Sequence, residues 1–261
     1  MKSKMLIFLL TFGLWGLCAD AQEYDVFLLI GQSNMAGRGW MIEGDENVFD
    51  ENVFLLDDKG EAVPARNPLN QYSTIGKEYS MQQIGPGYGF SKKLSSVTGR
   101  KILLVVNARG GTRIAQWMKG AEDGFYEEAV KRTKQAMKFG QLKAVLWHQG
   151  CGDTSRKDTY LDSLSVFVGN LREDFGRNVP FVAGELGRWR PHVTGFNQML
   201  HGIAGRIPDS DWVSSEGCMP IVTEKSGGSP DMKDAHFDRE SQILLGERYA
   251  GKILKMCYDN K

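Results

Sequence analysis

Short apolar runs alternate with longer stretches of helical periodicity along this chain. The strand-like runs, each ended by glycine or another turn former, cover residues 24–30, 101–106, 143–147 and 179–183. Apolar residues at helical spacing cover residues 88–97, 124–139, 159–175 and 239–258. Because uninterrupted apolar strands are typical of a sheet buried on both faces, the alternation predicts a three-layer α/β/α sandwich around a central parallel sheet.

Residues 38–78 interrupt this rhythm. They contain scattered acidic residues, asparagines and prolines, and their only strand-like run is 52–56. We expect a surface excursion that borders one side of a site. Since no linker, repeat or low-complexity segment follows, the sequence predicts one catalytic domain over residues 22–261.

The first residues have the layout of a secretory signal peptide. Lys2 and Lys4 precede an apolar stretch over residues 5–17, and small residues follow as Ala19-Asp20-Ala21. The apolar stretch is shorter than the ~20 residues that a membrane-spanning helix needs. We therefore predict a signal peptide over residues 1–21, cleavage after Ala21, no stable membrane insertion afterwards, and a periplasmic or extracellular protein.

The charge balance and the cysteine content exclude some classes of partner and of disulfide framework. Lysine plus arginine equals aspartate plus glutamate at 32 each, so no net positive charge favours nucleic acid as a partner. Cys18 would leave with the signal peptide, and Cys151, Cys218 and Cys257 would remain. Three cysteines form at most one disulfide, whose pairing the sequence leaves open, as it does the oligomeric state.

Reactive groups follow several of the predicted strands, at the edge of a parallel sheet where ligands bind. Ser33 stands just past the first strand and just before a probable helix start, where the hydroxyl group of a nucleophile can be exposed. Gly110 and Gly111 follow the second strand and Gln149 follows the third. Together with the Ser33 N–H, these groups would form converging donors for the oxyanion of an acyl-transfer intermediate.

A nucleophilic serine needs a base, and His236 is the best placed histidine. It lies just before the last predicted helix, between Asp231, Asp234 and Asp238, and a nearby carboxylate can fix the tautomer of an imidazole. His148 directly follows a strand, which favours a structural role. The remaining histidines, His192 and His201, lie in or beside a loop and a helix and are expected at the surface.

Four blocks, in this order, resemble those of one hydrolase family. They are GQSNMAGRG (31–39), NARGGTRIAQW (107–117), WHQGCGD (147–153) and DAHFD (234–238). They are similar to the sialate O-acetylesterase-like hydrolases, which include the acetylxylan esterases of carbohydrate esterase family six, within the SGNH superfamily of flavodoxin-like fold.

The resemblance implies a role for each matching position. Ser33 would be the nucleophile and His236 the base, and the Ser33 N–H, Gly110 or Gly111, and Gln149 would bind the oxyanion. No metal and no organic cofactor is implied.

Two positions depart from the family pattern. The family places its acid three residues before the histidine, where this chain has Lys233. We predict Asp234 as the catalytic acid, with Asp231 and the strand-end residue Glu185 as rivals, and a slower dyad if none reaches the histidine. Cys151 stands where relatives carry glutamate, and we interpret it as a small, half-buried apolar residue.

These observations predict a secreted carbohydrate O-acetylesterase acting on acetylxylan or O-acetylated sialic acid. Gln32, Arg113, Trp117 and Trp189 are candidate substrate contacts, and Trp40 and Arg38 lie in the same loops. The indole rings could equally pack inside the protein, and the arginines could pair with carboxylates.

Two alternatives remain at this point. One is a catalytically weak or inactive secreted glycan-binding protein on the same fold, which the displaced acid supports. The other is a lipase or peptidase, disfavoured because the sequence shows no long apolar lid.

Overall fold

A computed structural model describes residues 24–259 of the chain, so the predicted signal peptide and its cleavage point lie outside the described residues. The described residues form a seven-stranded sheet in the order β3-β2-β4-β1-β5-β6-β7. Neighbouring strands are parallel except for β3, which runs antiparallel to β2 at the edge. The strands are β1 (Tyr24–Gly31), β2 (Val53–Leu56), β3 (Ala62–Pro64), β4 (Lys101–Ala108), β5 (Gly140–His148), β6 (Phe181–Gly184) and β7 (Ser210–Val213).

Helices cover both faces of the sheet. The α-helices of the described part are α1 (Ser33–Ala36), α2 (Pro86–Thr98), α3 (Phe125–Ala136), α4 (Lys157–Asp174), α5 (Thr194–Leu200), α6 (Ile203–Arg206) and α7 (Arg239–Cys257). Single turns of 3-10 helix are η1 (Tyr79–Met81), η2 (Ile114–Trp117), η3 (Thr154–Arg156), η4 (Pro191–Val193) and η5 (Glu224–Ser226). No helix among residues 24–259 has the length and apolar character to cross a membrane.

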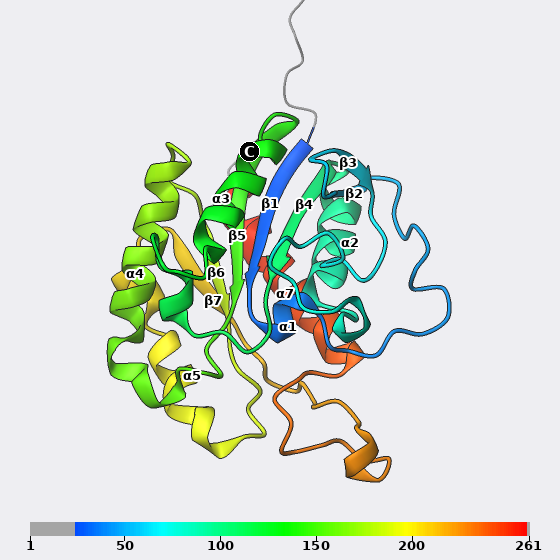
Figure 1. Cartoon of the computed structure of the whole chain (residues 1–261), viewed down its shortest axis with the longest axis vertical. Helices are drawn as coiled ribbons and strands as arrows, with labels where there is room; N and C mark the ends of the chain where they lie inside the picture. The colour runs from blue at the N-terminus through cyan, green and yellow to red at the C-terminus, as the bar shows by residue number, and fades with distance from the viewer. Residues whose placement is uncertain (1–23, 260–261) are drawn as a thin grey trace, which may run out of the picture.

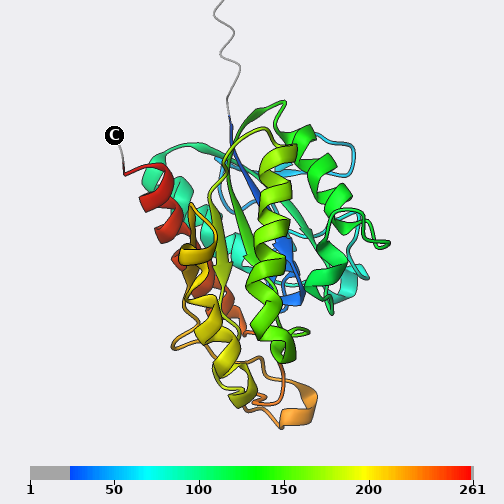
Figure 2. The same cartoon turned by 90° about the vertical axis from the view of Figure 1, so that its left-hand side faces the viewer.

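Side chains of β1 alternate between two separate cores. Phe27 and Leu29 pack with α2 and α7 on one face, whereas Val26, Leu28 and Ile30 pack with α3, α4 and α5 on the other. Figures 1 and 2 show α7 (red) across the sheet from α3 and α4 (green). The predicted three-layer sandwich is therefore confirmed.

The long apolar segments were predictable and the edge elements were not. The predicted strands and helices correspond to β1, β2, β4, β5 and β6 and to α2, α3, α4 and α7, with ends that differ by a few residues. β3 and β7 were not predicted. Both are short and lie at sheet edges, and their sequences, AVP and SDWV, contain no continuous apolar run. The cysteines Cys151, Cys218 and Cys257 are all free.

The central position of β1 gathers the loops that carry the chemistry. β1 lies between β4 and β5, and Gly31 at its end pairs with Ala108 on one side and His148 on the other. A Cβ at Gly31, where φ is +132°, would lie 2.4 Å from the His148 carbonyl oxygen, so only glycine allows this close approach. The segments after the three strands therefore meet at one edge, as expected for a site in an open parallel sheet.

Close packing between α2 and α7 determines where the histidine loop begins. A Cβ at Gly89 would lie 2.2 Å from the Ile243 carbonyl oxygen, and one at Gly246 would lie 2.1 Å from the Pro86 carbonyl oxygen. The two backbones thus approach more closely than side chains would allow. Because α7 starts at Arg239, three residues after His236, this contact anchors the loop that carries the histidine.

Gly246→Ala is expected to lower the free energy of unfolding by about 1–3 kcal/mol, because the added methyl group must displace helix backbone. Gly251→Ala is the matched control in the same helix, since a Cβ there has no atom of the described residues within 4 Å. It should raise stability by about 0.5–1 kcal/mol through helix propensity. Urea unfolding followed by circular dichroism measures both, and equal effects would contradict the close α2–α7 contact.

Candidate active site

Ser33 is the first residue of α1 and directly follows the turn at the end of β1. The Met35 and Ala36 N–H groups both donate to the Gln32 carbonyl oxygen at 3.0 Å and form the first turn of this short helix. No acceptor among residues 24–259 faces the Ser33 N–H, and the side chain remains 6% exposed. The serine therefore presents both a hydroxyl group and an unused backbone donor at the sheet edge.

The structure brings Ser33, His236 and Asp234 together. His236 Nε2 lies 2.9 Å from Ser33 Oγ, and His236 Nδ1 lies 2.7 Å from Asp234 Oδ1. The same carboxylate oxygen accepts the backbone N–H of His236 at 2.8 Å. These contacts require the tautomer with hydrogen on Nδ1, which leaves Nε2 free to accept the serine hydroxyl. The arrangement can remove a proton from Ser33.

Asp231, one rival for the acid position, is engaged elsewhere. Its carboxylate accepts the Thr223 hydroxyl at 2.7 Å and the Lys233 backbone N–H at 3.1 Å. These bonds shape the turn before Asp234 and lower the pKa of Asp231. Asp231 thus orders the loop and makes no bond to His236 in the described structure.

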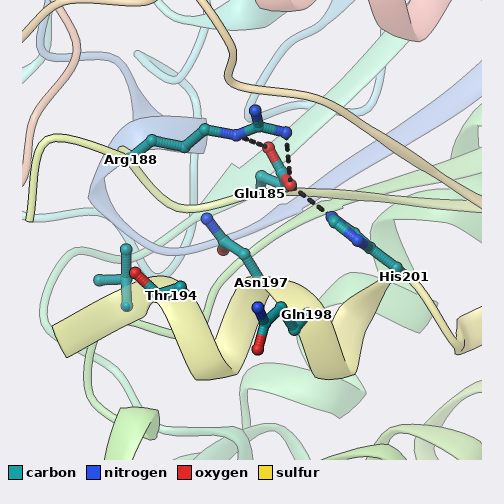
Figure 3. Close-up of a pocket in the computed structure, with 7 residues that line it drawn as sticks. Glu185, Arg188, Thr194, Asn197, Gln198 and His201 are labelled. Atoms are coloured by element: carbon teal, nitrogen blue, oxygen red, sulfur yellow. Dashed lines mark hydrogen bonds and ion pairs between the residues drawn. The ribbon is translucent and has the colours of Figure 1, made fainter. Parts of the chain in front are cut away.

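Glu185, the other rival, belongs to a separate cluster at the end of β6. Arg188 donates two hydrogen bonds to its carboxylate, and Ser215 N–H donates a third. His201, stacked on Trp212 with ring centroids 3.8 Å apart, approaches the other side of the carboxylate (Figure 3). With its oxygens occupied in this way, Glu185 braces the β6 end.

Backbone donors surround the serine. A Cβ at Gly110 would lie 3.3 Å from Ser33 Cβ and 2.9 Å from Arg38 Nη2, so Gly110 passes directly beside Ser33. Its N–H, like that of Ser33, meets no acceptor within the described part of the chain. Gly111, at φ +78°, lies farther out beneath the Lys77 ammonium group. Unused N–H groups beside a serine suit a developing oxyanion.

The prediction that Gln149 donates to the oxyanion is not supported. Its side-chain amide donates to the Thr112 carbonyl oxygen at 2.9 Å and to Asp153 Oδ2 at 2.7 Å, which uses both hydrogens. Its Oε1 accepts the Tyr160 hydroxyl at 2.9 Å. Gln149 is buried beneath the loop after β4 and holds that loop in place.

A cavity of about 380 Å³ adjoins Ser33. Gln32 and Cys151 line it, and Gln32 Oε1 accepts the backbone N–H groups of Gly150 at 3.1 Å and Cys151 at 3.2 Å. Substrate contact by Gln32 remains a prediction. Burial raises the pKa of the Cys151 thiol, which keeps it protonated, in line with its interpretation as a small apolar residue.

Trp117 and Trp189, both predicted substrate contacts, make hydrogen bonds within the protein. Trp117 is fully buried, and its Nε1–H donates to Thr112 Oγ1 at 3.0 Å, so the prediction that it contacts substrate is wrong. Trp189 is half-buried, packs edge-on against Phe237, and donates to the Asp234 carbonyl oxygen at 2.8 Å. It supports the acid loop and does not line the cavity beside Ser33.

Arg113 is exposed beside the cavity. Its Cγ lies 3.0 Å from the position of a Cβ on Gly152, one of the lining residues. It forms no ion pair with a carboxylate in the described structure. A contact between Arg113 and substrate remains a prediction.

Asn34, which sequence reasoning missed, connects the serine loop to the histidine loop. Fully buried, it donates from Nδ2 to the Ala235 carbonyl oxygen at 3.0 Å and accepts the Phe237 N–H at 3.2 Å. These two partners flank His236. The only signal in the sequence was a polar residue directly after the nucleophile in the first block.

Comparison with known proteins identifies the family of this chain. A family model described as carbohydrate esterase, sialic acid-specific acetylesterase, matches residues 23–255. The chain belongs to this family of carbohydrate esterases. The protein is therefore an esterase, and the predicted family is confirmed.

Individual relatives extend over most of the chain. A probable carbohydrate esterase of Arabidopsis thaliana is 33% identical to this esterase over 242 residues, which cover 85% of this chain and 86% of the relative. The X-ray structure of the protein from that locus superimposes with a TM-score of 0.73 at 25% identity, covering 89% and 98% of the two chains. A carbohydrate acetylesterase from Xanthomonas citri, at 17% identity, shares the fold with a TM-score of 0.64, over 90% of this chain and 57% of its own.

Burial and several nearby charges shift the pKa of His236 in this esterase. Burial lowers the pKa of His236 below its usual range, and the positive charges of Arg38 and Arg190 add to this effect. The carboxylate of Asp234 opposes it. The imidazole therefore remains neutral, and able to accept a proton, at a lower pH than an exposed histidine.

Asn34→Ala should lower kcat by ~10- to 100-fold, because the two backbone groups that flank His236 lose their common partner and the imidazole moves from the serine. Leaving buried groups unpaired should also lower stability by about 1–3 kcal/mol. Gln242→Ala is the matched control, since it removes a bond to Asn34 Oδ1 and leaves both bonds to the histidine loop. A kcat loss of equal size in Gln242→Ala would indicate general destabilisation.

Arg190→Gln should move the acid limb of the kcat/KM profile to higher pH. With His236 as the predicted base, activity requires its neutral form and rises as pH passes its pKa, and removing a positive charge raises that pKa. Arg206→Gln serves as control, because Arg206 pairs with Asp162 on the exposed surface. A downward shift, or the same shift in both variants, would refute this electrostatic effect.

Proposed function

We propose that the protein is a secreted carbohydrate O-acetylesterase that works through Ser33, His236 and Asp234. The observation that carries the proposal is the unbroken chain of contacts from Ser33 Oγ through the imidazole to Asp234, with Nε2 at 2.9 Å from the hydroxyl oxygen. The unused N–H groups of Ser33 and Gly110 beside it support acyl transfer in particular.

The reaction follows from these positions. His236 Nε2 takes the hydroxyl proton as Ser33 Oγ attacks the acetyl carbonyl carbon, and the Ser33 and Gly110 N–H groups stabilise the oxyanion. Asp234 holds Nδ1–H and stabilises the imidazolium. The intermediate collapses, the sugar oxygen leaves with the proton from Nε2, and acetyl-Ser33 remains. Water, activated by the same histidine, then releases acetate and restores Ser33.

The charges at the cavity favour an acidic acetylated sugar over neutral xylan. Arg38 and Lys77 line the cavity beside Ser33, and neither forms an ion pair with a carboxylate among residues 24–259. A sugar carboxylate, such as that of sialic acid, would provide the missing partner. Export, inferred from the first 21 residues of the sequence, would bring the enzyme to glycans outside the cell.

The competing candidate, a glycan-binding protein without useful catalysis, loses its main argument. That argument was the lysine at the usual acid position, but Asp234 reaches Nδ1 of His236 from the next residue. The alternative now requires an intact Ser–His–Asp arrangement that does not react.

Acetate release tests the proposal on acetylated xylan, O-acetylated sialic acid and an aryl acetate. We expect wild type to release acetate, faster from the sialic acid ester than from xylan. Ser33→Ala and His236→Ala should lose activity by ~10⁴-fold or more, and Asp234→Asn by somewhat less. Asp231→Asn is the matched control: it lies in the same loop, but its carboxylate contacts Thr223 and Lys233, so most activity should remain.

Other outcomes would redirect the assignment. A folded wild type that releases no acetate from any ester would refute the esterase mechanism and favour the binding protein. A larger loss in Asp231→Asn than in Asp234→Asn would show that Asp231 supports catalysis.

A further inference from the structure

A second cavity, of about 540 Å³, shares lining residues with the cavity at Ser33. Arg38, Met81 and His236 line both, so the two cavities adjoin at the catalytic histidine. Its volume is in the range that holds a drug-sized ligand. The acetyl group and the sugar ring that carries it need to contact only the part nearest Ser33, and this larger space remains beyond them.

Trp40 forms one wall of the second cavity and is unusually accessible. Its side chain is 53% exposed, although the indole Nε1–H donates to the Val222 carbonyl oxygen at 2.9 Å. The hydrogen bond fixes one edge of the indole. A large aromatic side chain that is held in place but left uncovered offers a prepared apolar face to a ligand, at little cost in ordering on binding.

The walls of this cavity come from three segments: the excursion after α1, the segment around η1, and the loop before α7. The excursion after α1 supplies Trp40, and the loop before α7 supplies Ile221 and Thr223. One isolated β-bridge joins Gly39 to Ile84, and another joins Pro220 to Phe237 within the loop before α7. The hydrogen bond from Trp40 to Val222 connects the excursion to that loop. In Figure 1 the orange segment around η5 extends past the edge of the sheet where α1 lies.

The chemistry of the lining suits a sugar ring. An indole face packs on the apolar C–H face of a pyranose, and polar groups at the rim bind its hydroxyl groups. Beyond Trp40 the cavity presents the charged side chains of Glu224 and Lys225, which can accept and donate such hydrogen bonds. Met81, 43% exposed, adds a second uncovered apolar side chain.

We propose that Trp40 forms a second sugar subsite. The sugar that neighbours the acetylated residue stacks on the indole, so the substrate is an oligosaccharide or polysaccharide in preference to a single acetylated sugar. This inference rests on the proposed function, because it places the acetyl group at Ser33. It assigns glycan binding to the excursion after α1.

Kinetics on three substrates test the subsite: an aryl acetate, O-acetylated sialic acid and O-acetylated sialyllactose. In Trp40→Ala, kcat/KM for the trisaccharide, relative to that for the aryl acetate, should fall by about 3- to 10-fold. Trp40→Phe should retain most of this ratio, since it keeps an aromatic face but loses the bond to Val222. Ile42→Ala, exposed on the same segment but not among the cavity-lining residues, should leave the ratio unchanged.

A binding measurement separates this inference from the proposed function. Ser33→Ala removes the nucleophile, and calorimetric titration with sialyllactose and with sialic acid should show tighter binding of the trisaccharide. Ser33→Ala combined with Trp40→Ala should lose that preference. Absence of acetate release by wild type would refute the proposed function alone, because the titration still reports on Trp40. Equal trisaccharide binding with and without Trp40, or an unchanged kinetic ratio in Trp40→Ala, would overturn the subsite.

Discussion

The contact between Ser33 Oγ and His236 Nε2 is the interaction on which the rest of the site depends. It joins residues 203 positions apart, so the end of β1 and the start of α7 must meet within a fraction of an ångström. Asn34, next to the serine, holds the histidine loop in position, because its side chain bonds to the backbone on both sides of His236. The close contact of α7 with α2 secures it from the other side.

Several buried polar groups around this contact hold loops in place. Gln149 and Asp153 are committed to the loop after β4, so they shape the backbone donors without facing substrate themselves. Glu185 is likewise committed, to Arg188 and His201. Atoms of these groups that bond inside the protein are not available to a substrate. Groups left unpaired at the surface of the cavity therefore point to function more clearly than residue type does.

The substrate side of the site is built from the irregular segments. The excursion after α1 does border the site, as its polar composition suggested, and Trp40 on it faces the cavity while Trp117 and Trp189 pack inside. Trp40 and Trp189 lie in loops, and Trp117 ends the 3-10 turn η2. Which of them remains uncovered depends on how neighbouring loops fold over each ring.

The amino-acid sequence was enough to predict the architecture and to select Ser33 and His236 as the candidate nucleophile and base. Apolar periodicity records which faces are buried, so β1, β4, β5 and the long helices were predictable. The turn after β1 indicated Ser33 as the candidate nucleophile, and the acidic residues around His236 indicated that histidine as the candidate base. The folded arrangement was needed to show that Asp234, and neither Asp231 nor Glu185, reaches the imidazole. It also decided that Gln149 has no free hydrogen and that Asn34 braces the histidine loop. The physical reason is that a local pattern specifies residue type and burial, whereas the direction of a side chain and the partners it uses depend on residues distant in sequence.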